Sequence, residues 1–436
     1  MILPINSSCQ WIVKPSVLKG SIQIPSSKSQ SIRALLFALL ARGRSTIYNL
    51  LRSPDVEAML TACAHLGARI EREGERVEVV GVAGRICGSE DVIQAGNSGL
   101  ILRLVGAIAA LSPLPIVITG DHSIRHIRPV SPLLDALSQL GVEATSLRGD
   151  GGAPILIRGP IHAGRAVMEG ADSQPVSGVL IASAFAEGPV EIDVKNPGER
   201  PWVHLTLDWL KRLGISYVAR NEEYYRLEGN AAIEGFTYRV PGDFSSVAYP
   251  LVAALLTGSE LCLENLDFKD LQGDKRVITY LQEMGAPIEI DEANHRVHVK
   301  KCKGLRGTTL DLNECIDALP ILAVVGCFAE GKTELRGAAI ARKKESDRIQ
   351  CIAQELNKMG ACIEEHPDGL TISRASLKGA EVHSCFDHRI ALSLAIAGLA
   401  SMGTTIIKET ACVDKSYPNF CAHMQSLGAS VILQDM

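Results

Sequence analysis

The sequence lacks an apolar run of membrane length and an excess of positive charge. The stretch 100–118 is largely apolar, but Arg103 and two prolines interrupt it. The chain carries 44 Lys and Arg against 49 Asp and Glu, which gives a formal net charge of -5. This balance argues against nucleic acid or an anionic membrane as a partner. An anionic ligand must therefore be bound by local clusters of positive side chains.

Several common site motifs are also absent. The twelve cysteines form no CxxC pair, which predicts reduced thiols rather than a disulfide framework. The HExxH motif is missing. The group that most resembles a metal site consists of His383, Cys385 and His388, but no second set of ligands accompanies it in the sequence, so we expect no bound metal. Without GxSxG, a Walker loop or GxGxxG, no nucleotide cofactor is predicted. No basic leader precedes an apolar core at the N-terminus, which predicts a cytoplasmic protein.

What the sequence does contain is a repeat. About every seventy residues, a hydrophobic residue and a glycine close a predicted helix, and strand-like sequence follows. The six glycines are Gly67, Gly141, Gly214, Gly285, Gly360 and Gly428. Each fits a left-handed helix C-cap. The pattern predicts an α/β protein of six βαβαββ units, arranged as two similar domains of three units each.

The domain boundary is predicted after the third unit, where Pro241 and Gly242 supply a turn. If the N-terminal segment pairs back with the second domain, the chain crosses between domains twice. We therefore predict one domain at 20–241 and another comprising 1–19 and 242–436. The hinges are expected near residues 20 and 241, with the active site in the cleft between the domains.

Each unit has a nearly uniformly apolar helix that begins after small polar residues. The six starts are SSKSQS, GNSG, ADSQP, GDFSS, CIDALP and CFDHR, and they contain good N-cap residues. Helices of this kind are expected to be buried on most sides. If the buried helices of a domain are parallel, their N-termini converge on one face. Free N–H groups and the helix dipole would bind anions there.

Lys28 stands at the first of these starts, where a positive charge opposes the helix dipole. A solvated lysine in a serine-rich loop is the simplest interpretation. However, Arg33 lies in the same helix, and Arg128, Arg389 and Lys415 lie in polar segments of other repeats. This distribution favours an anion as the partner of Lys28.

Glu345 and Arg348 precede an apolar helical stripe. Extending the stripe backwards by three and four residues reaches both, which places them on the inward face of the helix's first turn. A carboxylate and a guanidinium there could act as acid/base and anion clamp, although a solvated charged face is the alternative.

Asp317, Asp243 and Asp387 each precede an apolar helix. Each is either an N-cap or a carboxylate that accepts a proton from a substrate hydroxyl, and the pattern does not choose among them. The residues alone thus predict a two-domain enzyme that closes over small, multiply anionic substrates without a metal.

Eight segments, from about residue 11 to residue 430, resemble motifs of the 5-enolpyruvylshikimate-3-phosphate synthase (3-phosphoshikimate 1-carboxyvinyltransferase) family. They are PSSKSQSIRALL, GNSG, DSQ, VPGDFSSVAY, DALPILAV, KKESDR, DHRIALSLAIAGL and DKSYPNF. The resemblance implies an inside-out α/β barrel-like fold in each of two domains. It also implies transfer of the enolpyruvyl group of phosphoenolpyruvate to the 5-hydroxyl of shikimate 3-phosphate, with release of phosphate. A monomer with two small-molecule substrates and no cofactor, nucleic acid or membrane partner is expected.

The resemblance implies roles for individual residues. Lys28 would stabilise charge in the addition, Asp317 would be the base near the 5-hydroxyl, and Glu345 would protonate the methylene carbon. The implied shikimate 3-phosphate ligands are Lys28, Ser29, Arg33, Ser173, Gln174, Asp317 and Lys344. The implied phosphoenolpyruvate ligands are Lys28, Gly99, Arg128, Gln174, Arg348, Arg389 and Lys415.

Five positions depart from the family pattern, and they cluster on the shikimate side. Leu100 replaces a threonine, and Ile340 replaces an asparagine. Asp172 and Glu199 stand where serines are usual, and Trp202 replaces a tyrosine or other residue. A carboxylate at position 172 would repel the substrate phosphate unless a cation compensates.

Two other functions are considered. The sister family, UDP-N-acetylglucosamine 1-carboxyvinyltransferase, commonly has a cysteine in the loop that reads TGDHSIRHIRP here, and Lys-Asn where this chain has Lys28 and Ser29. A non-catalytic repeat protein, or a degenerate family member, is the other alternative. In a partner-binding repeat protein the cations should line a continuous stripe, whereas here they stand singly at helix starts.

Overall fold

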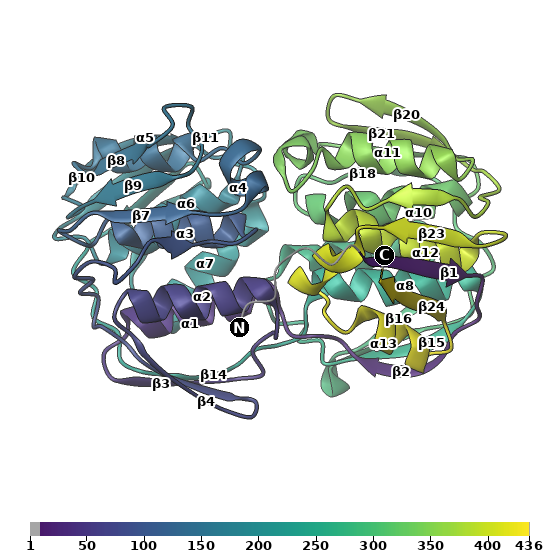
Figure 1. Cartoon of the computed structure of the whole chain (residues 1–436), viewed down its shortest axis with the longest axis horizontal. Helices are drawn as coiled ribbons and strands as arrows, with labels where there is room; N and C mark the ends of the chain where they lie inside the picture. The colour runs from purple at the N-terminus through teal and green to yellow at the C-terminus, as the bar shows by residue number, and fades with distance from the viewer. Residues whose placement is uncertain (1–8, 436) are drawn as a thin grey trace. The chain divides into compact units, whose positions relative to one another are not determined.

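The computed structural model describes residues 9–435, and these fall into two compact units. The N-terminal unit is Ser26–Pro241, and the C-terminal unit runs from Gly242 onward and includes the described residues before Ser26. Residues 1–8 and 436, which were assigned to the second predicted domain, lie outside the described residues. Each unit is built from three similar repeats of helices and strands (Figure 1).

The N-terminal unit holds the first three repeats. The first contains α1 (Lys28–Leu40), β3 (Arg44–Tyr48), α2 (Pro54–His65), β4 (Arg69–Glu73) and β5 (Arg76–Val80). The second contains β6 (Ile93–Gln94), α3 (Gly99–Ala109), β7 (Ile116–Thr119), α4 (His122–His126), α5 (Ser131–Gln139), β8 (Glu143–Ser146) and β9 (Ile155–Arg158). The third contains β10 (Gly164–Glu169), α6 (Ser173–Ala184), β11 (Val190–Lys195), α7 (Arg200–Arg212), β12 (Tyr217–Arg220) and β13 (Tyr224–Leu227), followed by β14 (Thr237–Arg239).

The C-terminal unit holds the other three repeats and several short 3-10 helices, labelled η. It begins with β1 (Cys9–Lys14) and β2 (Lys19–Gln23). The fourth repeat contains α8 (Phe244–Thr257), β15 (Glu260–Glu264), η1 (Gly273–Lys275), α9 (Arg276–Glu283), β16 (Ile288–Asp291), η2 (Glu292–Asn294) and β17 (Arg296–Val299). The fifth contains β18 (Thr309–Asp311), η3 (Ile316–Ala318), α10 (Leu319–Phe328), β19 (Lys332–Arg336), η4 (Ala339–Lys343), α11 (Arg348–Lys358), β20 (Cys362–His366) and β21 (Gly369–Ser373). The sixth contains β22 (Glu381–His383), α12 (His388–Ala400), β23 (Thr405–Lys408), η5 (Thr410–Lys415), α13 (Phe420–Ser426) and β24 (Ser430–Asp435).

The described residues form six four-stranded sheets with one shared pattern of pairing. In the second repeat, β6 pairs parallel with β7, β7 pairs antiparallel with β9, and β9 pairs antiparallel with β8. The helix between two parallel strands is the usual crossover connection, and the last two strands form a hairpin. The predicted α/β class and βαβαββ order are therefore confirmed.

Two strands are exchanged between repeats at the points where the chain passes from one unit to the other. β2 precedes α1 but pairs with β15, whereas β14 precedes α8 but pairs with β3. Because the whole of β2 is paired within the C-terminal unit, the first crossing lies at Pro25–Ser26 rather than near residue 20. The second crossing lies at Pro241–Gly242.

The segment that precedes the first repeat completes the last sheet. β1 pairs antiparallel with both β23 and β24. In Figure 1 this strand is coloured purple and lies among the yellow strands of the C-terminal end. The pairing expected for the N-terminal segment is thus present from Cys9 onward.

The first helix of each repeat is buried along almost its whole length. In α3, for example, every residue from Gly99 to Ala109 is buried. These helices pack on one another inside their own unit, α3 against α6 and α12 against both α8 and α10. A helix that is apolar all round is stable only when it is covered on every side, which explains why the sheets surround it.

The polar residues at the helix starts act largely as predicted. Ser27, Ser98, Asp172, Asp243 and Asp387 each accept a hydrogen bond from a backbone N–H of the helix that follows. The fifth repeat differs, because α10 begins without a side-chain cap. Asp317 is therefore not an N-cap, and its carboxylate is available for other partners.

The glycines that mark the repeat have the backbone conformation that the sequence predicts. All six have positive φ, from 75° at Gly214 to 102° at Gly67. A residue with a Cβ atom is strained in this region, which accounts for glycine after each of these helices. The twelve cysteines all lie among the described residues, and each is a free thiol. Within residues 9–435, no helix combines the length and apolarity needed to span a bilayer.

Candidate active site

A cluster of charged side chains lies in the C-terminal unit around Asp317. This residue is in η3, and its two carboxylate oxygens bind two arginines. Nη1 of Arg348 lies 2.6 Å from Oδ1, and Nη2 of Arg389 lies 2.6 Å from Oδ2. The arginines come from the starts of α11 and α12, so the fold brings the beginnings of three segments together at one carboxylate.

Arg348 is buried and binds two further carboxylates. Its Nε donates to Oδ2 of Asp387 at 2.8 Å, and its Nη2 donates to Oε2 of Glu345 at 2.7 Å. Asp387 also accepts a hydrogen bond from the hydroxyl of Ser346 and caps α12. With its guanidinium held on three sides, Arg348 has a fixed orientation, as expected for a planar group with several N–H donors.

Glu345 lies before α11 and not in its first turn, as the sequence pattern had predicted. The helix starts at Arg348 and is capped by Asp347. Glu345 nevertheless lies beside Arg348, because the loop returns its carboxylate to that guanidinium. Its other oxygen accepts a hydrogen bond from Nζ of Lys415 at 2.6 Å. The predicted proximity of Glu345 and Arg348 is correct, but the predicted helical register is wrong.

The electrostatic balance of this cluster favours charged forms. Burial alone would raise the pKa of Asp317, but the charges of Arg389 and Arg348 outweigh it and lower that pKa to about 2. Lys344 lowers it further. Burial would lower the pKa of Arg348, but Asp387 and Glu345 raise it well above its usual value. Asp317 is therefore a carboxylate in this arrangement, and the arginines remain cations.

A second group of predicted residues lies in the N-terminal unit. Ser27 caps α1, so Lys28 is the first residue of that helix. Its side chain is partly exposed, and Nζ lies 3.5 Å from Oδ2 of Asp55 in α2. Asp55 thus partly offsets the unfavourable interaction of a lysine with the positive end of the helix dipole. Ser29 is half-buried beside it.

Arg33 is buried inside the N-terminal unit, one turn further along α1. It donates to the hydroxyl of Thr206 at 3.1 Å and to the carbonyl oxygens of Ser29 and Trp202. These contacts join α1 to α7 and hold Ser29 at the start of α1.

Gly99 is the first residue of α3, and two guanidinium groups approach it closely. A Cβ atom at this position would lie against Nη1 of Arg128 and Nη1 of Arg103. Both arginines are buried. Arg103 was not predicted as a site residue. Glycine at position 99 therefore gives room for two positive charges at the start of α3.

The start of α6 carries Ser173 and Gln174 together with two of the unusual carboxylates. Oδ1 of Asp172 accepts from the backbone N–H of Gln174, and Oε2 of Glu199 accepts from the backbone N–H of Ser173 at 3.1 Å. Arg103 lies 3.2 Å from Asp172 and donates to Oε1 of Gln174 at 2.9 Å. The cation that a carboxylate at position 172 requires is therefore present.

In the C-terminal unit the structure joins the predicted residues Asp317, Glu345, Arg348, Arg389 and Lys415 in one network, whereas those of the N-terminal unit lie at or near the starts of α1, α3, α5 and α6. It also adds residues that the sequence analysis did not select, namely Asp55, Arg103, Ser245, Asp274 and Ser346. A search for side chains at the starts of the other helices could have found Asp55. Ser245 is the second residue of α8 and could have been found in the same way. Arg103 lies in the middle of α3, Asp274 in η1 and Ser346 in a loop, where no local pattern marks them.

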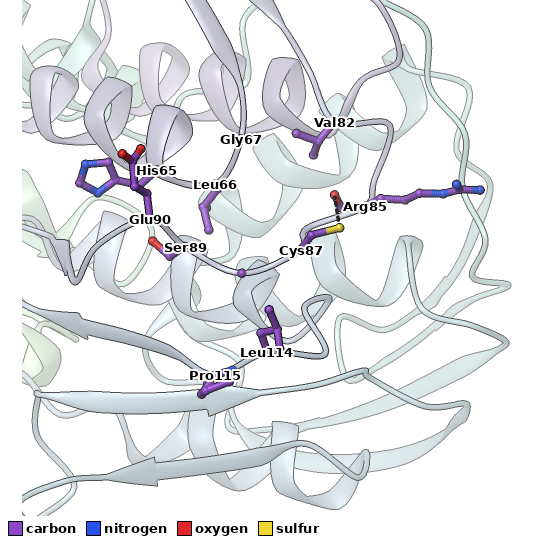
Figure 2. Close-up of a pocket in the computed structure, with 11 residues that line it drawn as sticks. His65, Leu66, Gly67, Val82, Arg85, Cys87, Ser89, Glu90, Leu114 and Pro115 are labelled. Carbon is purple, nitrogen blue, oxygen red and sulfur yellow. Dashed lines mark hydrogen bonds between the residues drawn. The ribbon is translucent and has the colours of Figure 1, made fainter.

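None of the predicted residues lines the pocket drawn in Figure 2. That pocket, of about 640 Å³, lies in the N-terminal unit between the end of α2, the loop after β5 and the turn before β7. Its lining includes His65, Cys87 and Leu114. In Figure 2 His65, Ser89 and Glu90 are drawn on one side of this pocket, and Arg85 and Cys87 on the other.

Comparison with known proteins gives one consistent result. A family model described as EPSP synthase (3-phosphoshikimate 1-carboxyvinyltransferase) matches residues 12–424. A 3-phosphoshikimate 1-carboxyvinyltransferase of Chlamydia muridarum is 43% identical over 99% of this chain and 97% of its own length. One of Chlamydia caviae is 41% identical over 96% of this chain and 94% of its own length.

A solved structure agrees with the sequence relatives. The EPSP synthase of Acinetobacter baumannii matches 98% of this chain and 100% of its own, with a TM-score of 0.83 and 28% sequence identity. The family model covers nearly the whole chain, and the relatives cover both units. The chain therefore belongs to the EPSP synthase family, the 3-phosphoshikimate 1-carboxyvinyltransferases.

Proposed function

We propose that this chain transfers the enolpyruvyl group of phosphoenolpyruvate to the 5-hydroxyl of shikimate 3-phosphate, releasing phosphate, as a step of the shikimate pathway. The observation that carries the proposal is the network of two carboxylates and three cations formed by Asp317, Glu345, Arg348, Arg389 and Lys415. It combines groups that bind anions with groups that exchange protons. Both substrates carry a phosphate and a carboxylate, which requires several cations.

Phosphoenolpyruvate is proposed to bind through Arg348, Arg389 and Lys415. The two guanidinium groups present N–H donors that suit a carboxylate or a phosphate. In the structure these donors bind Asp317. A substrate anion that takes them over would remove the charges that keep the pKa of Asp317 near 2.

The pKa of Asp317 would then rise towards the range in which a carboxylate accepts a proton efficiently at neutral pH. Asp317 is accordingly proposed as the base that takes the proton of the 5-hydroxyl as that oxygen attacks. Binding of the anionic donor and activation of the base are coupled in this scheme. Lys344, whose charge also acts on Asp317, is proposed as a ligand of shikimate 3-phosphate.

Glu345 is proposed to protonate the methylene carbon. The ammonium group of Lys415, 2.6 Å from Oε1, is placed to pass a proton to this carboxylate. Arg348 holds the other oxygen at 2.7 Å and fixes its direction. General acid catalysis of this kind contributes a factor of about 10² to 10⁴.

The group in the N-terminal unit is proposed to act on the same two substrates. Lys28 would contact both and stabilise charge in the addition, and Gly99 and Arg128 would serve phosphoenolpyruvate. Gln174 would serve both substrates. Ser29, Arg33 and Ser173 are proposed on the shikimate 3-phosphate side. Because Arg103 offsets the negative charge of Asp172, the carboxylate at this position need not repel the phosphate of shikimate 3-phosphate. The ion pair therefore supports phosphate binding at the start of α6.

We further propose that the enzyme acts in the cytoplasm as a monomer without a cofactor. The free thiol state of all twelve cysteines supports a reducing compartment. Size-exclusion chromatography with light scattering tests the monomer, and a mass of two chains would contradict it.

The direct test is phosphate release from phosphoenolpyruvate by the purified full chain. Release is expected with shikimate 3-phosphate as acceptor and not with UDP-N-acetylglucosamine. Release only with the UDP-sugar would assign the chain to the sister reaction. No release with either acceptor, from a protein that unfolds cooperatively, would identify a degenerate family member.

A further inference from the structure

A buried carboxyl group lies near Asp317 and has no part in the scheme above. Asp274 is in η1, at the start of α9, and only 2% of its surface is exposed. Oδ2 is hydrogen-bonded to the hydroxyl of Ser245, and Oδ1 accepts from the thiol of Cys315 at 3.5 Å. Both partners are neutral groups, so neither compensates a negative charge on Asp274.

The charged surroundings of Asp274 disfavour its ionised form. Burial is the largest effect, and the charges of Asp317 and Asp243 add to it. Arg389 is the cation that acts against them. The pKa of Asp274 is raised from its usual 3.8 to about 8, whereas that of Asp317 is lowered to about 2. Two neighbouring carboxyl groups are thus driven to opposite protonation states, a pattern found where acid and base roles are divided.

Hydrogen bonds connect Asp274 to the proposed base. The hydroxyl of Ser245 binds Asp274 and also accepts from Nη2 of Arg389 at 3.2 Å. The same Nη2 lies 2.6 Å from Oδ2 of Asp317. One nitrogen of Arg389 therefore donates both to Asp317 and to the hydroxyl that Asp274 holds.

We propose that Asp274 is a positioning residue that holds a proton at neutral pH, and that its neutral carboxyl keeps Arg389 directed at Asp317 and at the substrate anion. The proposal rests on the roles given to Arg389 and Asp317 above. Loss of the proton would place a second negative charge beside Arg389. The guanidinium would then be shared between two carboxylates, and its hold on phosphoenolpyruvate would weaken.

The consequence is a pH dependence of substrate binding. The wild-type kcat/KM for phosphoenolpyruvate should fall above a pH near 8, mainly through a rise in KM, and should lose a factor of about ten per pH unit beyond it. In Asp274→Asn the carboxamide imitates the neutral acid and cannot ionise. The kcat/KM of this variant should therefore not fall above pH 8 and should stay level until lysines begin to lose protons near pH 10.

The experiment measures kcat and KM for phosphoenolpyruvate from pH 6 to 10, at saturating shikimate 3-phosphate, in the wild type and Asp274→Asn. The control is Asp193→Asn, because Asp193 pairs with Arg165 at the surface of the other unit. The control should retain the wild-type limb. An alkaline limb of equal pKa in wild type and Asp274→Asn would overturn the proposal.

A measurement that needs no turnover separates this proposal from the proposed function. Infrared spectra of the wild type should contain a protonated-carboxyl band at pH 7 that is lost near pH 8 and is missing from Asp274→Asn. The absence of such a band in the wild type would overturn the proposal even if the enzyme is active. Should the variant fail to fold, the wild-type titration still decides. If the wild type showed the band but had no enzyme activity, the result would contradict the proposed function and not the protonation of Asp274.

Discussion

The ammonium group of Lys415 lies 2.6 Å from Oε1 of Glu345, a residue seventy positions earlier in the chain. Arg348 lies 2.7 Å from the other oxygen of the same carboxylate. One carboxyl group is thus fixed by two cations from different segments of the C-terminal unit. Such an arrangement gives the acid a defined direction and a nearby proton source, and it makes the first prediction specific to Glu345.

Glu345→Gln should lower kcat by a factor of about 10² to 10⁴, because the carboxamide fills the same space but cannot deliver a proton. Turnover is measured with both substrates saturating, and thermal unfolding is measured in parallel. Glu364→Gln is the control, since Glu364 is exposed in β20. A Glu345→Gln variant with nearly normal kcat would show that the methylene proton comes from another group.

Lys28→Ala should lower kcat by a factor of about 10² to 10³ while the protein stays folded. The expected loss is that of one group that stabilises charge in the transition state. Tm should fall, because Asp55 is buried and loses its ion pair with Lys28, but the Lys28 side chain is partly exposed and fills no core position, so the fold should persist. Steady-state kinetics and circular dichroism are the measurements, with exposed Lys211→Ala as control. If Lys28→Ala lost activity only in proportion to unfolded protein, a structural role would explain Lys28 instead.

Gly99→Ala should raise KM for phosphoenolpyruvate more than it lowers kcat. The new Cβ would push against the guanidinium groups of Arg128 and Arg103 and displace them. A displacement that costs about 1–3 kcal/mol in binding corresponds to a rise in KM of roughly 5- to 150-fold. Gly164→Ala is a matched control, because a Cβ there meets only the Leu140 side chain at an ordinary 3.6 Å. An unchanged KM in Gly99→Ala would remove Gly99 and Arg128 from the binding site.

Asp274→Asn should stabilise the protein more at pH 8.5 than at pH 5. The pKa of Asp274 is about 8 in the folded protein, against a usual 3.8, so the folded form keeps a proton that the unfolded chain loses between these values. Stability contributed by this proton is present in full below pH 4 and is lost as the pH rises towards 8. Asparagine removes that loss. The measurement is the difference in Tm between variant and wild type across this range, and a difference independent of pH would contradict it.

The repeat, the buried helices and most of their N-caps could be predicted from the sequence because they depend on local pattern. Gly67 and its five counterparts have positive φ, and a helix that is apolar on every side must be buried. Register is harder to predict. The stripe in α11 suggested that Glu345 lies in the helix, but the N-cap Asp347 starts the helix at Arg348. An N-cap sets the first residue of a helix through contacts within one turn. A spacing of apolar residues that repeats over several turns therefore does not show at which residue the helix begins.

By itself the sequence therefore determined the six repeats, the α/β class and the identity of most charged groups. The tertiary structure decided that β2 and β14 exchange repeats, that Asp317 binds two arginines instead of capping α10, and that Asp274 lies buried within the same network. The physical reason is range. Propensities, caps and left-handed glycines act over a few residues, whereas strand exchange and the ionisation of a buried carboxyl depend on charges and chain segments that only the complete fold brings together.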